Sequence, residues 1–68
     1  MEKLIEMLDY YVRACKNNSD RNIREKFYDQ AFGATEMYMR LNGEDEQKVC
    51  DMWMATYRPQ FIELVYGV

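Results

Sequence analysis

The 68-residue chain contains no histidine and only two cysteines, Cys15 and Cys50, so it lacks most of the side chains that build metal sites and covalent staples. A structural zinc ion usually takes four cysteine or histidine ligands, more than these two thiols provide. A cysteine nucleophile needs a base or a positive field to become a thiolate, and histidine is the usual base. We therefore predict no metal ion, no cofactor and no disulfide framework, and we interpret both cysteines as small core residues.

Long uncharged stretches are also missing, because charged residues interrupt the apolar ones every few positions. A membrane-spanning helix needs about 18 or more apolar residues in succession, and nothing in this chain approaches that length. The first six residues, MEKLIE, are charged and amphipathic and do not resemble the apolar core of a signal peptide. We therefore expect a cytoplasmic protein with no membrane association.

The sequence signatures of catalysis are absent as well. The chain has no phosphate-binding glycine loop, no nucleophile elbow, no dinucleotide fingerprint and no paired-histidine motif. A domain near 60 residues buries only about 60% of the surface that its unfolded chain exposes, which leaves little room for a pocket that excludes water. We therefore predict that the protein is not an enzyme and has no catalytic residues.

The chain is rich instead in residues suited to helix packing and to contact surfaces. Hydrophobic residues make up 49% of it, including six tyrosines and six methionines, and charged residues make up 31%. This composition is too apolar for a disordered chain. Small domains often gain stability from disulfides, metals or oligomerisation, and only oligomerisation is left open here. We expect one folded domain over residues 1–68.

Apolar residues recur at three- and four-residue steps and predict a first helix over residues 2–16. The capping residues of the segment 17–20 break the chain before a second helix, which ends near Leu41. Asn42-Gly43 is a typical C-terminal cap, with the glycine in the left-handed conformation. Gly33, in the middle of the second helix, is interpreted as the point where another helix crosses closely.

The third helix begins at the acidic run 44–46, where negative charge complements the helix dipole. Its periodicity continues past Pro59, which removes one helix hydrogen bond and clashes with the carbonyl of Ala55. The sequence therefore predicts a kink or a break near Pro59, and Gly67 as a final cap. The expected fold is all-α: a small antiparallel three-helix bundle whose third helix is kinked or broken near Pro59.

Two constellations admit a functional and a structural interpretation. The acidic residues between 44 and 51 resemble a cation site, but they lack the alternating ligands and glycine of a calcium loop, and a charged helix start accounts for them. Trp53, Tyr57 and Phe61 could stack on a base or a cofactor. Because they are spaced by four, we predict that they belong to the core.

Basic residues gather between positions 13 and 26, where five of them face only two acidic residues, Asp20 and Glu25. This segment carries a net charge of +3 and the remaining residues a net charge of −6. A small nucleic-acid-associated regulator that uses this corner is therefore the alternative function. The whole-chain charge of −3 weighs against it. The candidate basic patch consists of Arg13, Lys16, Arg21, Arg24 and Lys26.

Several apolar residues have no obvious inner position in a three-helix bundle. Most are methionine or tyrosine, and both types suit contact surfaces. We therefore predict a non-catalytic protein-interaction module that pairs with its own copy as a homodimer or with another protein. In a variant of this hypothesis the acidic face over residues 44–51 occupies a basic site on a partner. The candidate interface residues are Met7, Tyr10, Met37, Met52 and Ile62.

Overall fold

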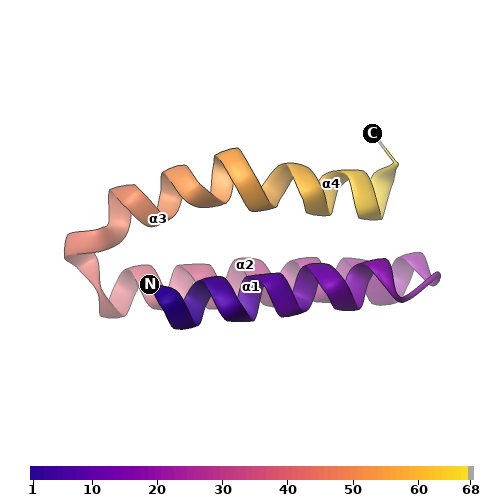
Figure 1. Ribbon diagram of the computed structural model, residues 1–68, viewed down its shortest axis with the longest axis horizontal. Helices are drawn as coiled ribbons and strands as arrows, with labels where there is room; N and C mark the ends of the chain where they lie inside the picture. The colour runs from indigo at the N-terminus through magenta and orange to yellow at the C-terminus, as the bar shows by residue number, and fades with distance from the viewer. Residues whose placement is uncertain (68) are drawn as a thin grey trace.

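The computed structural model describes residues 1–67 and confirms an all-α bundle of three rods (Figure 1). The first rod is α1 (Glu2–Lys16) and the second is α2 (Arg21–Leu41). A 3-10 turn over Gly43–Asp45 leads into the third rod. The third rod consists of α3 (Glu46–Met52), a π-helical turn (Trp53–Tyr57) and α4 (Arg58–Tyr66).

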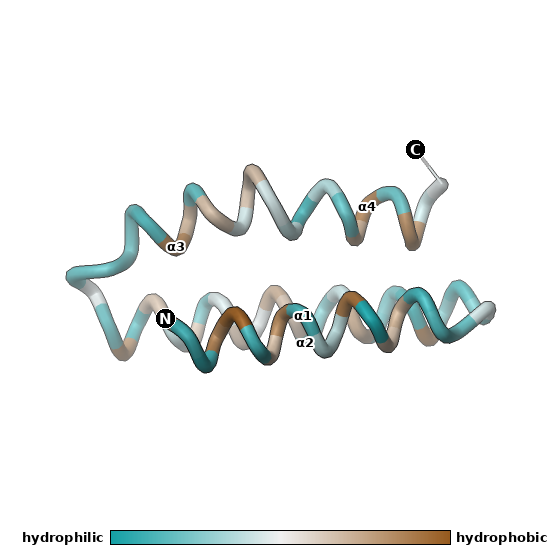
Figure 2. Tube along the Cα trace, viewed as in Figure 1, coloured by the Kyte–Doolittle hydropathy of each residue, from teal (hydrophilic) through white to brown (hydrophobic). Residues whose placement is uncertain are grey.

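Consecutive rods run antiparallel, and the N-terminus lies at the same end as the α2–α3 connection (Figure 1). The rods α1 and α2 lie side by side, and the third rod packs along both of them. The bundle is elongated, with extents of 37 × 19 × 16 Å. Its hydropathy follows this arrangement, with apolar and polar residues alternating around each rod (Figure 2).

The helix ends match the predicted boundaries, with one difference in mechanism. The side chain of Asp20 caps α2 by accepting a hydrogen bond of 2.9 Å from the backbone N–H of Asn22. Gly67 caps α4 in the left-handed conformation with φ 75°, as predicted. Gly43 does not adopt that conformation, because the chain continues from Asn42 directly into the 3-10 turn. The left-handed role expected of Gly43 is therefore wrong.

Each rod buries one row of side chains. An aromatic cluster links α2 to the third rod, with the rings of Tyr28 and Phe61 stacked 5.5 Å apart and nearly parallel. The predicted core stripe of Trp53, Tyr57 and Phe61 is confirmed, since all three are buried. The buried residues within 1–67 are Leu4, Leu8, Val12, Cys15, Ala31, Thr35, Val49, Trp53, Tyr57, Phe61 and Val65.

The two cysteines differ in their surroundings, although both had been assigned to the core. Cys15 is fully buried, and burial raises the pKa of its thiol against the opposing effect of nearby Arg24. Cys50 is exposed. The core prediction for Cys50 is wrong because Val49 takes the inward position, and the next residue is rotated by about 100° around the helix.

Gly33 is exposed, and a methyl group placed at its Cβ position would meet nothing within 4 Å. The expected helix crossing at Gly33 is therefore wrong. The small residues at the inner face of α2 are Ala31 and Thr35, both buried. The hydroxyl of Thr35 donates to the carbonyl oxygen of Ala31 at 2.8 Å, so this polar group is satisfied inside the core.

The irregularity predicted near Pro59 is present as a π-helical turn rather than as an open break. Pro59 has no N–H to donate to Ala55, and its ring disfavours regular helix geometry just before it. The backbone N–H of Arg58 reaches back five residues to the carbonyl oxygen of Trp53. Helical winding therefore passes through Trp53–Tyr57, and α4 starts with the proline in its first turn.

The π-turn also keeps the buried row of the third rod in line. Val49, Trp53, Tyr57, Phe61 and Val65 follow one another at a strict spacing of four residues. On a regular α-helix with 3.6 residues per turn, each such step rotates the row by about 40°. A π-helical turn has more residues per turn, so it reduces this drift and lets all five side chains face the core.

Gly33→Ala should raise the free energy of unfolding by about 0.5–1 kcal/mol, because the site is an exposed, unobstructed helix interior. Urea unfolding followed by circular dichroism measures the change. The matched control is Gly67→Ala, which should lower stability because Gly67 has a positive φ. Destabilisation by Gly33→Ala would contradict the placement of Gly33.

Candidate functional site: an apolar groove between α1 and α2

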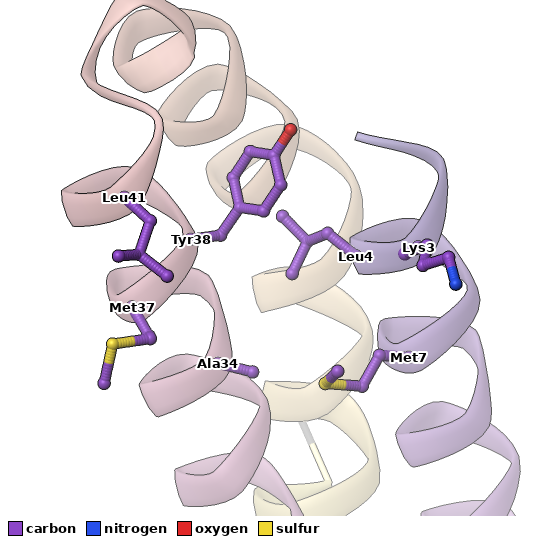
Figure 3. A pocket seen from close by; sticks show the side chains of 7 residues that line it. All are labelled: Lys3, Leu4, Met7, Ala34, Met37, Tyr38 and Leu41. Atoms are coloured by element: carbon purple, nitrogen blue, oxygen red, sulfur yellow. The ribbon is translucent and has the colours of Figure 1, made fainter.

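A groove of about 240 Å³ lies between the first half of α1 and the last turns of α2. Figure 3 shows it with the third rod passing behind, so the groove opens on the side of the α1–α2 layer that this rod leaves uncovered. Its walls are almost entirely apolar. The lining residues are Lys3, Leu4 and Met7 from α1 and Ala34, Met37, Tyr38 and Leu41 from α2.

The groove has a fixed floor and exposed rims. Leu4 is buried and belongs to the core cluster, and Tyr38 packs against that cluster. The Tyr38 hydroxyl donates to the carboxylate of Asp45 at 3.5 Å. Burial raises the pKa of Tyr38, and the charge and hydrogen bond of Asp45 raise it further. The end of α2 is therefore tied to the 3-10 turn.

The rims carry side chains that no other part of residues 1–67 covers. The exposed fractions are 43% for Met7, 58% for Met37 and 75% for Leu41. Met7 and Met37 were predicted interface residues, and the structure brings them to one groove. Leu41 was not among the predicted interface residues. Its position four residues after Met37 was the available signal, since such residues share a helix face.

Tyr10, another predicted interface residue, lies outside the groove but next to it. It follows Met7 by three residues on α1, so the two side chains are neighbours on the helix surface. Its ring is 57% exposed and packs edge-on against Tyr11, with centroids 5.6 Å apart. We call Met7, Tyr10, Met37 and Leu41 the outer face.

Met52 and Ile62 do not belong to the outer face. Both are half-buried, and Met52 packs against the core cluster. Met52 follows the buried Val49 by three residues and Ile62 precedes the buried Val65 by three, so each lies beside the inward row. The expectation that they have no inner position is therefore wrong.

Two residues of the predicted basic patch make contacts within the fold, and the other three are exposed. The guanidinium of Arg24 donates from Nε to the carbonyl oxygen of Asn18 and from a terminal nitrogen to that of Leu64, the latter at 2.8 Å. The Arg21 guanidinium lies 5.3 Å from the ring centre of Tyr66. These two residues therefore hold the end of α4 against the start of α2. Arg13, Lys16 and Lys26 are exposed.

A second polar tie joins α1 to the π-turn. Tyr57 is only 5% exposed, and its hydroxyl donates to the carboxylate of Asp9 at 2.8 Å. Burial raises the pKa of Tyr57 to about 12, with further contributions from the hydrogen bond and the negative charge of Asp9. This bond fixes the third rod relative to α1 on the side away from the outer face.

Comparison with protein families, curated proteins and solved structures finds no match for this chain. In residues 1–67 no group of three or more cysteine, aspartate and glutamate side chains is arranged to hold a metal ion. Over the same residues, no helix is both long and apolar enough to cross a bilayer.

Tyr57→Phe should lower the free energy of unfolding near neutral pH by about 1–2 kcal/mol, because it leaves the Asp9 carboxylate without its donor. In the unfolded chain a tyrosine ionises near pH 10. Since the folded-state pKa is raised to about 12, the stability from this group is present below about pH 10 and lost as the pH rises through about 12.

Thermal melts at stepped pH test this expectation. The wild-type melting temperature should fall between about pH 10 and 12 more steeply than that of Tyr57→Phe. The control Tyr66→Phe, at an exposed ring that keeps its contact with Arg21, should change neutral-pH stability by less than about 0.5 kcal/mol. Parallel alkaline profiles for wild type and Tyr57→Phe would refute the assigned role of Tyr57.

Arg24→Met should lower the free energy of unfolding by about 1.5–3 kcal/mol, because it keeps the apolar stem but removes two hydrogen bonds from a charged donor. Lys26→Met, at an exposed site two residues away, is the control and should change stability by less than about 0.5 kcal/mol. Equal effects of the two variants in urea unfolding would show that Arg24 is an ordinary surface charge.

Proposed function

We propose that this protein is a non-catalytic protein-interaction module that self-associates through its outer face. The observation that carries the proposal is the apolar groove together with the exposed side chains on its rims. Leu41, Met37 and Tyr10 are the three most exposed large hydrophobic side chains recorded in residues 1–67. Contiguous exposed apolar patches of this kind typically mark interaction surfaces.

The other hollows of the surface have a different character. One is lined by Glu36, Met39, Arg40 and Glu46, so it offers charge of both signs and a lining that is about equally polar and apolar. Another, near the end of α4, is lined largely by polar and charged side chains. Hydrophobic contact therefore favours the α1–α2 groove over these sites as the surface that a partner covers.

A second copy of the chain is the partner that we propose. Small soluble oligomers are most often two-fold symmetric dimers, in which the same patch meets itself. A stable interface buries about 1,000 Å² or more in total, roughly 500 Å² from each copy. That share is about a tenth of the 4763 Å² accessible surface of the chain.

Nucleic-acid binding through the basic corner has weaker support. Two of its five cations, Arg21 and Arg24, make contacts within the fold. The net charge of the whole chain, with all five cations included, is −3, which disfavours binding to a polyanion. A decisive variant must spare Arg24, because its loss would destabilise the bundle. Substitution of Arg13, Lys16 and Lys26 by glutamate therefore tests nucleic-acid binding at this corner and leaves the contacts of Arg21 and Arg24 in place.

Sedimentation equilibrium at micromolar concentration should give about twice the 8.3 kDa chain mass. Met37→Glu and Leu41→Glu should each shift the mass toward monomer, because a charge buried in an apolar contact is costly. The matched control is Met54→Glu, since Met54 is 52% exposed but lies on the π-turn of the third rod. A monomeric wild type at high concentration would contradict self-association.

A further inference from the structure

The dipeptide Asn42-Gly43 connects α2 to the 3-10 turn. Asparagine is a labile residue, because the backbone nitrogen of the following residue can attack its side-chain carbonyl carbon. Glycine hinders this attack least, since it has no side chain. Of the four asparagines in the chain, Asn42 alone is followed by glycine. The space around Gly43 is open as well, because a methyl group at its Cβ position would meet nothing within 4 Å.

We propose that Asn42 is a deamidation site, held unreactive by the cap of α2, and that its conversion loosens the α2 wall of the groove. In the reaction the backbone nitrogen of Gly43 gives up its proton and bonds to Cγ of Asn42. The bond between Cγ and Nδ2 breaks, and the nitrogen leaves as ammonia with that proton. Water then opens the cyclic imide at either carbonyl and leaves aspartate or isoaspartate. The reaction needs no oxidant and no cofactor.

The cap of α2 holds Asn42 away from this reaction. Its backbone N–H and its side-chain Nδ2 both donate to the carbonyl oxygen of Tyr38, at 2.9 and 3.1 Å. Its own carbonyl oxygen accepts from the N–H of Asp45 at 2.9 Å. The ψ of Asn42 is 62°, which for an L residue puts the Gly43 nitrogen on the side of the Cα–C bond opposite Cβ. Ring closure therefore requires rotation about that bond, which breaks the hydrogen bond from Asp45, so deamidation proceeds from a locally opened cap.

The other asparagines, Asn17, Asn18 and Asn22, are each followed by a residue with a side chain. The N–H that follows Asn17 donates to the carbonyl oxygen of Cys15 at 3.2 Å. The side-chain oxygen of Asn18 accepts from the N–H of Asp20 at 3.0 Å. Asn22 lies in the first turn of α2, which ring closure would unwind. Both the chemistry and the contacts therefore rank these three below Asn42.

Conversion of Asn42 changes the end of the helix that builds the groove. Loss of Nδ2 removes a donor from the carbonyl oxygen of Tyr38 and puts a carboxylate in its place. The new charge lies at the C-terminus of α2, where the helix dipole is negative, and next to the acidic run 44–46. Isoaspartate also routes the backbone through the side chain and lengthens the connection. Tyr38 and Leu41, which line the groove, therefore lose part of their support (Figure 3).

The deamidation site does not depend on the proposed self-association, and mass spectrometry of peptides tests it directly. Wild-type protein is incubated for several weeks at mildly alkaline pH, folded and in urea, and aspartate and isoaspartate are quantified at each asparagine. Asn42 should convert first in both samples, and roughly tenfold or more slowly in the folded one. Earlier conversion of another asparagine, or an Asn42 that stays intact in the folded protein throughout, would overturn the site. Equal rates at Asn42 in the two samples would overturn its protection by the cap.

Gly43→Ala is a variant that changes the chemistry and spares the fold, because Gly43 has no positive φ and open space around it. It should slow the conversion of Asn42 in urea roughly tenfold, since the new methyl group hinders the attacking nitrogen. Circular dichroism should show an unchanged helical content. An unchanged rate in urea would contradict attack by the nitrogen of residue 43.

Asn42→Asp mimics one product and tests the consequence. It should lower the melting temperature by about 4–8 °C, because the carboxylate replaces a donor at the negative end of α2. The matched control is Asn18→Asp, which keeps the acceptor for the N–H of Asp20 and should leave the melting temperature unchanged. Equal melting temperatures for Asn42→Asp and wild type would overturn the loosening of α2, while peptide mapping still decides whether the site exists.

Discussion

The bundle depends on the third rod keeping one row of side chains against α1 and α2 over its whole length. That row has a strict four-residue spacing, from Val49 to Val65, which an unbroken α-helix would turn steadily away from the core. The π-turn before Pro59 corrects the rotation, and the Tyr57 hydroxyl that it presents binds Asp9 of α1. The π-turn before Pro59 therefore both keeps the buried row facing the core and places Tyr57 to bind α1.

The same arrangement explains why an apolar surface is left open. A three-rod bundle has an α1–α2 layer with two sides, and the third rod covers only one of them. The side chains on the other side, including Met37 and Leu41, are therefore exposed although they are apolar. No further helix within residues 1–67 covers them.

Helical periodicity was sufficient to predict the fold class, the ends of α1 and the end of α2, because these follow from local patterns and caps. It failed for Cys50 and Met52, where predicting the buried side requires the phase of the helix and not only its period. The prediction for Gly33 failed because its small size was interpreted as a sign that another helix crosses there. The small residues on the inner face of α2 are instead Ala31 and Thr35.

The candidate site was predictable only in part. Met7 and Met37 were identified as residues without an inner position, but their meeting in one groove depends on the register between α1 and α2. Leu41 was missed although its spacing of four residues from Met37 places both on one helix face. The internal role of Arg24 was beyond local reasoning, because its hydrogen bond to Leu64 joins residues 40 positions apart.

Methionine methyl resonances followed by NMR over a dilution series report directly on self-association through the outer face, because the probes lie on different faces of one small protein. If the chain self-associates through this face, the methyl signals of Met7 and Met37 shift with concentration, while that of Met54 on the third rod stays constant. A shift confined to Met54, or constant signals from all three together with a monomeric mass at high concentration, would contradict self-association through the outer face.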